Sequence, residues 1–473
     1  MSYQLFYKLT FLLAFSVFLF AGTAREASAA TRTVTKLADT NDNICNADCS
    51  LREAVAVANG GDFIIFEPAL TNQTITLYLG VIKINKNLFI TGVDNLRISG
   101  DNKSRIFYVN GGANVTINNL GLKNGLAQYP DVLPSTGDGG AVLVDGSSTL
   151  TLNDSRAYSN NGFHGGAIAS HGTLKLKNTQ IYGNNAVYAG GGIYAEASNS
   201  TVEITDSVIK LNQAQWGGGL SISNGTLKMS GTSVYANTAT DDTRGGGGLY
   251  LGGYNYFPTS YGTNFMITDS TISGNTAASG GGIYNYANLS LINSTVSGNK
   301  ATKNGGGLYH TANGGPVVGV LLVRNATLTL NTANMQGGGI YRDGEFGEFN
   351  MGNTIAAGNG NFNYTAPDLK GTVNSLGHNL FGSMSGAVVL GDLSGNQINP
   401  DPQLAPLDNY GGKTKTHLPQ LTSAALNAGS NMLALDANGS QLATDQRGKN
   451  RFNGIVDIGA VERYNERVFS PLE

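Results

Sequence analysis

Three charged residues that are close neighbours in the chain form the densest group suited to acid–base chemistry. They are Asp241, Asp242 and Arg244. Lyases that cleave polysaccharides commonly need clustered carboxylates for calcium and a nearby Arg or Lys base, while glycoside hydrolases need two carboxylates about 5–10 Å apart. All three residues share one short loop, which is also typical of a solvated turn. An enzyme hypothesis would rest on them, with calcium as a cofactor only for a lyase and no cofactor otherwise.

Aromatic side chains suggest a different chemistry, which is contact with the flat faces of sugar rings. A segment at 252–263 is crowded with tyrosines, and the single tryptophan lies beside a glycine run. Exposed aromatic residues on loops favour binding over folding. The candidate ligand-binding residues are Trp216, Tyr250, Tyr254, Tyr256 and Tyr261.

Other catalytic and metal motifs are missing from the sequence. It contains no G-x-S-x-G, and none of its five histidines forms an H-E-x-x-H pair. The stretch Gly411–Thr414 imitates the end of a phosphate-binding loop, but the required earlier glycine would fall on Leu407. We therefore predict no metal site in the repeats and no nucleotide site.

The composition limits the kind of protein further. Glycine accounts for 66 of 473 residues, and charged residues for only 13 %. Average usage is about 7 % glycine and about 25 % charged residues. The formal net charge of −3 provides no basic field for phosphates, so the sequence disfavours nucleic-acid binding.

An internal repeat predicts the elements that must position these residues. Glycine runs such as GGAI at Gly165 and GGGL at Gly217 recur along the chain, separated by short alternating apolar stretches and by Asn. These read as three short strands per unit, and no helix of ten residues fits. A single unit cannot bury its apolar face, so the units must stack. We predict an all-β, right-handed parallel β-helix of roughly a dozen coils.

Two columns of the repeat have clear expectations. Ile168, Ile193 and Leu220 begin an aliphatic row that continues to Ile340 and should face inward. The following residue is often tyrosine, so a stacked aromatic row should face outward. That row serves either to stabilise the sheet or to bind sugars. A mixed column just before the glycine runs forms either a solvated edge or the lining of a groove: Asp138, His164, Trp216, Arg244, Asn304 and Gln336.

A pair of polar positions six residues apart also recurs, for example Asp269 with Asn275 and Asn118 with Asn124. We expect this Asn column to occupy a left-handed turn and its amides to hydrogen-bond from coil to coil.

The N-terminus carries the features of an export signal. Lys8 precedes an apolar run, and Ala27, Ser28 and Ala29 form a small-residue cleavage pattern, so we place cleavage after Ala29. The apolar run is too short to cross a bilayer, and no later stretch is long enough. The only cysteines, Cys45 and Cys49, should form a local disulfide in an exported protein.

Several motifs resemble one group of known proteins. The segment 49–54 reads CSLREA, the motif that names a domain of secreted bacterial right-handed β-helix proteins, and 401–414 with 444–462 is similar to the end of the choice-of-anchor Q group. The repeats between them resemble those of the pectin-lyase-like fold and of chlamydial polymorphic outer-membrane proteins. The resemblance implies β-helix architecture and export. It implies no particular activity, because most members have no established one.

The predicted organisation follows from these signals. Ser50 and Glu53 form a capping box for a short helix that should plug the first coil, and the proline-containing segment after Asn361 should close the other end. The boundaries are 1–29 for the signal peptide, 30–110 for the N-terminal cap and first coils, 111–360 for the repeats, 361–463 for the C-terminal coils and closing segment, and 464–473 for a tail.

Two functions compete on this sequence. The first is a non-catalytic secreted or cell-surface protein, a monomer that contacts polysaccharide or cell-surface components through its long faces. The alternative is a polysaccharide lyase or glycoside hydrolase, which the fold permits only by analogy. The regularly spaced glycine, aliphatic and Asn positions all serve the stacking of coils, and the acidic and basic residues are few and dispersed. We therefore favour the first function.

Overall fold

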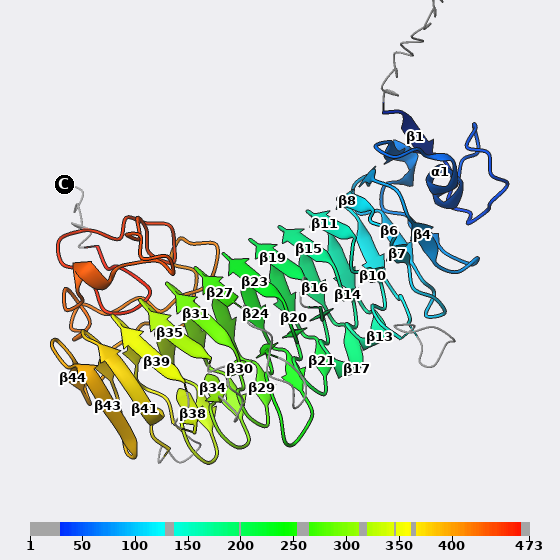
Figure 1. The fold of residues 1–473 in the computed structure, drawn as a ribbon. Helices are drawn as coiled ribbons and strands as arrows, with labels where there is room; N and C mark the ends of the chain where they lie inside the picture. Colours follow the sequence, from blue (N-terminus) through cyan, green and yellow to red (C-terminus); the bar gives the residue numbers. More distant parts are fainter. Residues whose placement is uncertain are drawn as a thin grey trace, which may run out of the picture.

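The structure is a computed structural model that describes residues 29–127, 137–197, 200–252, 264–311, 319–344, 347–360 and 366–464. The candidate residues Tyr254, Tyr256 and Tyr261 lie outside these ranges. The chain forms a long rod of stacked coils that runs from α1 at one end to β43 and β44 at the other (Figure 1). The predicted parallel β-helix is confirmed, and all of its strand pairs within the rod are parallel in the described residues, as between β11 and β15.

Four parallel sheets form the faces of the rod. Sheet A consists of β1 (Thr31–Val34), β2 (Phe63–Phe66), β5 (Leu88–Thr91), β8 (Asn114–Asn118), β11 (Thr149–Asn153), β15 (Thr173–Lys177), β19 (Thr201–Thr205), β23 (Thr226–Ser230), β27 (Asn264–Thr268), β31 (Asn288–Ile292), β35 (Val320–Arg324), β39 (Glu348–Gly352), β41 (Leu369–Leu376) and β43 (Ala387–Asp392). Sheet B consists of β3 (Thr74–Thr76), β6 (Arg97–Ser99), β9 (Gly121–Lys123), β12 (Arg156–Tyr158), β16 (Gln180–Tyr182), β20 (Val208–Lys210), β24 (Ser233–Tyr235), β28 (Thr271–Ser273), β32 (Thr295–Ser297), β36 (Thr327–Thr329), β40 (Ile355–Ala356), β42 (Leu380–Phe381) and β44 (Gln397–Ile398).

The other two sheets complete each coil. Sheet C consists of β4 (Ile82–Ile84), β7 (Phe107–Val109), β10 (Val142–Val144), β14 (Ile168–Ser170), β18 (Ile193–Ala195), β22 (Leu220–Ile222), β26 (Leu249–Leu251), β30 (Ile283–Asn285), β34 (Leu308–Thr311) and β38 (Ile340–Asp343). The short sheet D consists of β13 (Asn161–His164), β17 (Asn185–Ala189), β21 (Gln213–Ala214), β25 (Thr238–Ala239), β29 (Thr276–Ala277), β33 (Lys300–Ala301) and β37 (Thr332–Ala333). The described helices are α1 (Leu51–Val57) and the short 3-10 turns η1 (Pro68–Leu70) and η2 (Asn431–Leu433).

The core is the inside of the coil stack. Ile168, Ile193 and Leu220 pair in register on neighbouring strands of sheet C, and each is fully buried. The row continues through Ile340 as expected. Side chains alternate across a strand, so the residue after each member of this row points out of the stack.

The structure divides the two roles that we expected of one Asn column. The first position of each pair, such as Asp269 or Asn293, adopts the left-handed backbone with φ near 50°. The second position, such as Asn275, carries the buried amide ladder between coils. For Asn118 and Asn124 the prediction is wrong by one residue. Asn118 pairs with Asn153 in the strand before the turn, and Asn119 adopts the left-handed backbone.

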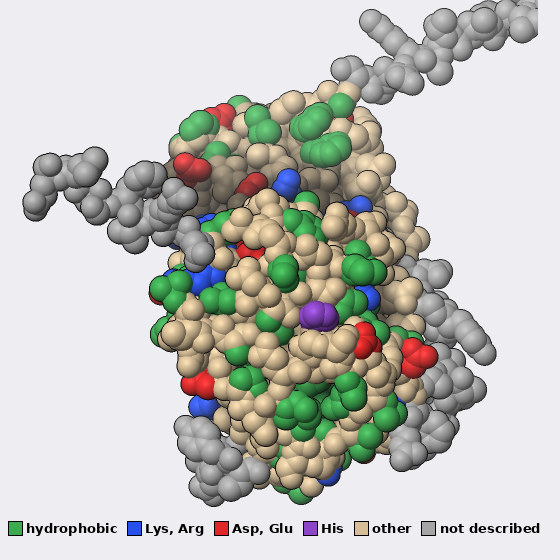
Figure 2. Space-filling view, turned by 90° about the vertical axis from the view of Figure 1, so that its left-hand side faces the viewer, with side chains coloured by type: hydrophobic (Ala, Val, Ile, Leu, Met, Phe, Trp, Pro, Cys, Tyr) green, Lys and Arg blue, Asp and Glu red, His purple; other side chains and the backbone are tan. Residues whose placement is uncertain are grey.

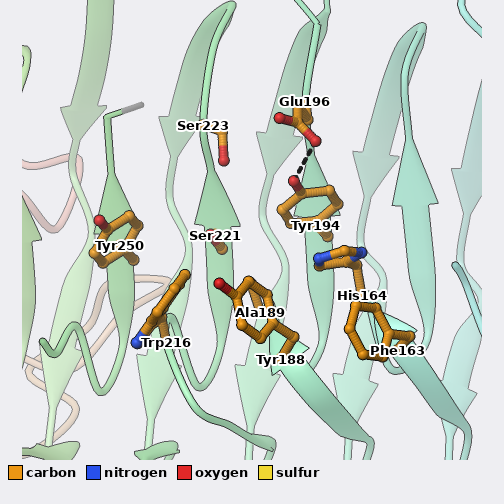
Figure 3. A pocket seen from close by; sticks show the side chains of 10 residues that line it. All are labelled: Phe163, His164, Tyr188, Ala189, Tyr194, Glu196, Trp216, Ser221, Ser223 and Tyr250. Atoms are coloured by element: carbon orange, nitrogen blue, oxygen red, sulfur yellow. Dashed lines mark hydrogen bonds between the residues drawn. The ribbon is translucent and has the colours of Figure 1, made fainter. Parts of the chain in front are cut away.

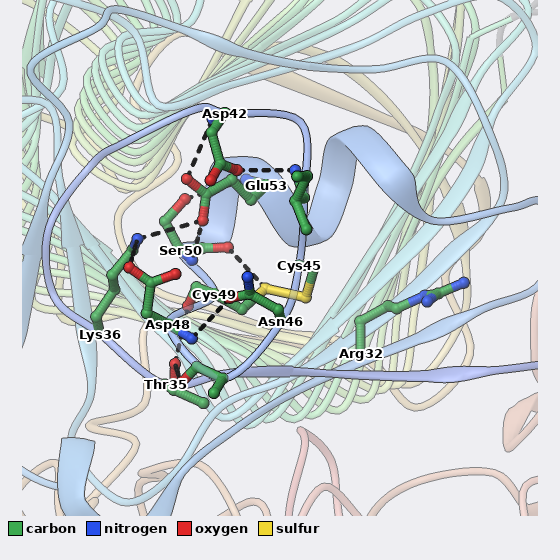
Figure 4. The surroundings of a disulfide bond; sticks show 12 residues. Arg32, Thr35, Lys36, Asp42, Cys45, Asn46, Asp48, Cys49, Ser50 and Glu53 are labelled. Carbon is green, nitrogen blue, oxygen red and sulfur yellow. Dashed lines mark hydrogen bonds and ion pairs between the residues drawn. A yellow bond between two sulfur atoms is a disulfide. The ribbon is translucent and has the colours of Figure 1, made fainter.

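The N-terminal end is plugged by α1. Ser50 and Glu53 form the capping box, and the helix begins at Leu51. Its buried residues Leu51, Ala54 and Val55 join the same core cluster as the first coils. A disulfide joins Cys45 and Cys49 beside the cap (Figure 4). No described helix is both long and apolar enough to span a bilayer.

The first part of the C-terminal segment forms the last coils, from β41 to β44. Its described residues beyond β44 do not cover the end coil, which corrects the expectation that they close the rod. They turn back and pack along the outer face of sheet B, where Ser297 Oγ lies 2.8 Å from His417 Nε2 and Thr295 donates to Gln446 at 2.6 Å. This segment is the orange and red region beside the later coils in Figure 1. In the described residues the end coil is therefore open, and hydrophobic side chains are visible on that end of the molecule in Figure 2. Ile398 is paired with the buried Phe381 of the preceding coil and is itself 58 % exposed.

Candidate functional site

The tyrosine row on the outer face of sheet C builds the candidate site. Tyr250, Tyr284 and Tyr309 pair in register on successive strands, with ring centroids 5.5 and 4.5 Å apart. The row points away from the core as predicted, but it is not open to solvent. Tyr250 is 1 % exposed, and Tyr194 and Tyr284 are 5 % exposed. These rings belong to a second apolar cluster outside the coil stack, together with Trp216 and Ala189.

The row begins with Tyr108, Leu143 and Ala169, and in its later part, from Tyr194 to Tyr341, one coil lacks an aromatic ring. Ser221 pairs with Tyr194 on one side and with Tyr250 on the other, so a serine stands where its neighbours have tyrosines. Consecutive parallel strands lie about 4.8 Å apart, so the two rings are separated by roughly twice that distance. The gap opens into a cavity of about 270 Å³ (Figure 3). Its lining residues are Phe163, His164, Tyr188, Ala189, Tyr194, Glu196, Trp216, Ser221, Ser223 and Tyr250.

Besides Tyr194 and Tyr250 of sheet C, the aromatic walls of the cavity come from sheet D and the turns after it. The rings of Tyr188 and Trp216 lie 4.4 Å apart, and those of His164 and Tyr194 lie 4.5 Å apart and nearly parallel. Phe163 stacks on Tyr188 at 5.6 Å. The mixed column before the glycine runs therefore lines a pocket here, through His164 and Trp216. This is the groove alternative that the sequence left open.

Hydrogen-bonding groups lie on one side of the pocket. His164 Nδ1 is 2.8 Å from Asp138 Oδ1, and His171 Nε2 is 3.6 Å from the other oxygen of the same carboxylate. The Tyr194 hydroxyl donates to the Glu196 carboxylate, which is exposed near the mouth. The hydroxyl of Ser223 completes this polar side.

Burial and neighbouring charges shift the pKa values of Asp138, His171 and Tyr194. Burial raises the pKa of Asp138, but hydrogen bonds from His164 and His171 outweigh it, so the pKa lies below its ordinary value. Asp138 in turn raises the pKa of His171 by a hydrogen bond. Burial and the nearby Glu196 carboxylate raise the pKa of Tyr194. The hydroxyl of Tyr194 therefore stays protonated near neutral pH and acts as a donor.

The three residues of the enzyme hypothesis do not form a paired acid–base site. Asp241 Oδ1 accepts hydrogen bonds from Thr243 and from the Arg244 backbone amide of its own loop. Asp242 is exposed. The Arg244 guanidinium lies 4.7 Å above the Trp216 ring, on the border of the aromatic cluster. The described part of the chain contains no group of three His, Cys, Asp or Glu side chains placed to hold a metal ion.

The structure brings together two of the five predicted ligand-binding residues, Trp216 and Tyr250. Sequence reasoning did not name Tyr188 or Phe163 as site residues, because both come from positions of sheet D that vary between coils. It also passed over Ser221. The signal for the pocket was present, however, because 221 interrupts the run of tyrosines between Tyr194 and Tyr341.

Comparisons with known proteins find a repeat family and similar solved structures. The Chlamydia polymorphic membrane protein repeat matches residues 269–286 and 293–311, which are two successive repeat units. Among solved structures, the chain is similar to the crystal structure of pectate lyase Pel9A, with 15 % identity, a TM-score of 0.44, and coverage of 92 % of this chain and 98 % of that one. No curated protein matches the sequence. The chain is a parallel β-helix protein, and two of its successive units are similar to the Chlamydia polymorphic membrane protein repeat.

Proposed function

We propose that this protein is an exported, non-catalytic β-helix that binds a glycan in the pocket between Tyr194 and Tyr250. The observation that carries the proposal is the missing ring at Ser221. It leaves a gap in the part of the row from Tyr194 to Tyr341, whose other positions are tyrosines, and the Trp216 ring, stacked on Tyr250 at 6.1 Å, lines that gap. A gap of this kind accepts a flat apolar face, and aromatic side chains present such faces to sugars at low entropic cost.

The polar side of the pocket suits the hydroxyl groups of a sugar. The Glu196 carboxylate accepts, and Ser223 can both donate and accept. A cavity of about 270 Å³ is near the lower limit of about 300 Å³ for small-molecule sites. We therefore expect one sugar unit, such as a chain end or a side branch, to enter the pocket.

The proposed location outside the cytoplasm has separate support. Lys8, the apolar run and the cleavage pattern ending at Ala29 have the form of a signal peptide. The CSLREA motif at 49–54 favours the group of secreted bacterial β-helix proteins, and a repeat named for a membrane protein matches residues 269–286. A disulfide between Cys45 and Cys49 fits an oxidising compartment.

A glycan panel tests the proposal. The mature chain should bind at least one immobilised glycan, and Ser221→Tyr should abolish that binding, because the new ring would fill the gap. Ser290→Tyr is the matched control, since it places the same ring on the outer face of sheet A at β31. Equal binding by the Ser221→Tyr variant would refute the pocket as the site.

The same panel separates contact from turnover. We expect no unsaturated products and no new reducing ends, with or without added calcium. Product formation that Asp241→Ala or Arg244→Ala abolishes would establish the lyase or hydrolase alternative instead.

A further inference from the structure

The outer face of sheet B carries a column of tyrosine and lysine side chains on the N-terminal half of the rod. Strand pairing places these residues in register on five successive coils. The column, called here the basic tyrosine face, consists of Lys123, Tyr158, Tyr182, Lys210 and Tyr235. All five side chains are partly exposed, while the residue before each of them is buried in the core.

The rings and ammonium groups of this column are arranged in space as well as in sequence. Tyr158 and Tyr182 stack at 5.0 Å with an interplanar angle of 1°. The Lys210 ammonium lies 5.5 Å from the Tyr182 ring and 5.8 Å from the Tyr235 ring. It therefore stays among the rings of its neighbours, with its charge held at the surface.

A second column beside the first adds two arginines. Arg97 and Arg156 flank Gly121, and a Cβ atom at Gly121 would lie 3.2 Å from Arg97 and 3.6 Å from the Tyr158 ring. The lack of a side chain at this glycine thus lets the Arg97 side chain lie close to Tyr158. Burial raises the pKa of the Tyr182 hydroxyl above its ordinary value. The charges of Arg156, Lys210 and Arg97 act in the opposite direction, which shows that all three cations lie near this hydroxyl.

The charge on this face is of one sign. None of the outward positions from β6 to β24 is an Asp or Glu. The neighbouring turns carry acidic residues, among them Asp154, which accepts from Asn178 at 2.6 Å, and Asp206, which pairs with Lys413. The C-terminal segment covers the later strands of the same sheet from Thr271 onward, as in the contact of Thr271 with Lys415, and it reaches the turn before β20 through Lys413. The five side chains of the basic tyrosine face stay partly exposed.

We propose that the basic tyrosine face binds an anionic polysaccharide along the axis of the rod. Stacked rings offer flat apolar surfaces to sugar rings, and cations on both sides pair with carboxylate or sulfate groups. A single-stranded nucleic acid would use similar contacts, and its binding is therefore a separate outcome of the test below. This site is separate from the pocket at Ser221 and does not depend on it.

Calorimetric titration of the mature chain with four probes tests the inference. Polygalacturonate fragments and dextran sulfate distinguish carboxylate from sulfate, and neutral dextran and a single-stranded oligonucleotide are the comparison polymers. We expect at least one anionic glycan to bind more tightly than both comparison polymers, with an affinity that falls as salt rises. The double variant Arg156→Gln with Lys210→Gln should weaken that binding by about tenfold.

Matched variants make the result specific. Lys177→Gln with Lys228→Gln removes the same charge from the outer face of sheet A and should leave the affinity unchanged. Ser221→Tyr should also leave it unchanged, since that variant blocks only the pocket. No binding of either anionic glycan, an equal loss in the sheet A control, or tighter binding of the oligonucleotide would each overturn the inference.

Discussion

Replacing Asn275 by alanine should destabilise the rod, because this side chain is one step of the buried amide ladder. Asn275 is fully buried. Its Nδ2 donates to the Val234 carbonyl at 3.0 Å and to Asn299 Oδ1 at 2.9 Å. Its Oδ1 accepts from both the backbone amide and the Nδ2 of Asn237, at 2.9 and 3.0 Å. One side chain thus links three successive coils.

The magnitude follows from the groups that the alanine variant leaves without partners. The Asn237 side chain keeps its hydrogen bonds to the Ile209 and Tyr235 carbonyls, and Asn299 Oδ1 keeps the Asn275 backbone amide. The Asn237 backbone amide loses the acceptor in the ladder and stays buried. A buried unsatisfied donor costs about 1–3 kcal/mol, and loss of the hydrogen bond from Asn275 Nδ2 to the Val234 carbonyl adds about 1 kcal/mol. We expect a loss of about 2–4 kcal/mol in the free energy of unfolding.

Urea unfolding followed by the fluorescence of Trp216, the single tryptophan, measures this loss. Asn334→Ala is a suitable control, because that side chain is exposed and makes no hydrogen bond among the described residues. Asn288 is less suitable, since its Oδ1 accepts from the Val320 amide at 2.8 Å. Equal midpoints for the variants at 275 and 334 would refute the ladder argument.

Three further predictions follow from the charges and the cysteines. Burial, helped by the nearby Asp457 carboxylate, raises the pKa of Glu462 to about 8, although the Arg451 guanidinium lies 3.2 Å away. The native state therefore holds a proton that the unfolded chain releases. Stability should therefore fall by up to about 1.4 kcal/mol per pH unit as the pH rises from the ordinary glutamate value towards 8, and Glu462→Gln should remove that slope in unfolding curves at several pH values. Asp138→Asn should lower the pKa of His171 measured by NMR, and an unchanged value would show that Asp138 does not act on this ring. Cys45 and Cys49 should resist alkylation without reductant in exported protein, and two labelled thiols in a mass spectrum would reject the bridge.

The stacking of the coils could be predicted from the sequence because it depends on local spacing. Ile193 and Leu220 occupy equivalent places in successive units, and equivalent places in a solenoid must pair. The helix at Leu51 was equally predictable, since its capping box lies within four consecutive residues. In each case the interacting groups are set by the repeat or by near neighbours.

Contacts outside the repeat could not be predicted in this way. Its prolines and the end of the repeat spacing indicated that the C-terminal segment leaves the coil pattern. No local feature indicated that His417 would contact Ser297, which is 120 residues away. The burial of Tyr250 has a similar cause. Alternation determines that its ring points out of the coil stack, while Trp216 and Tyr286, which pack against it, belong to other positions of the repeat.

The pocket lies where one coil has serine between two tyrosines, and substitution of Ser221 tests whether that serine is kept for binding. A tyrosine at 221 would stack between Tyr194 and Tyr250, and each aromatic pair contributes about 0.5–1.5 kcal/mol beyond its buried area. The Ser221→Tyr variant should therefore be more stable than the natural chain by about 1–3 kcal/mol while it loses the glycan. Stability gained with binding lost is the pattern of a position kept for function. A lower unfolding temperature for this variant would instead show that the serine is required by packing, and the pocket would then be a by-product of the fold.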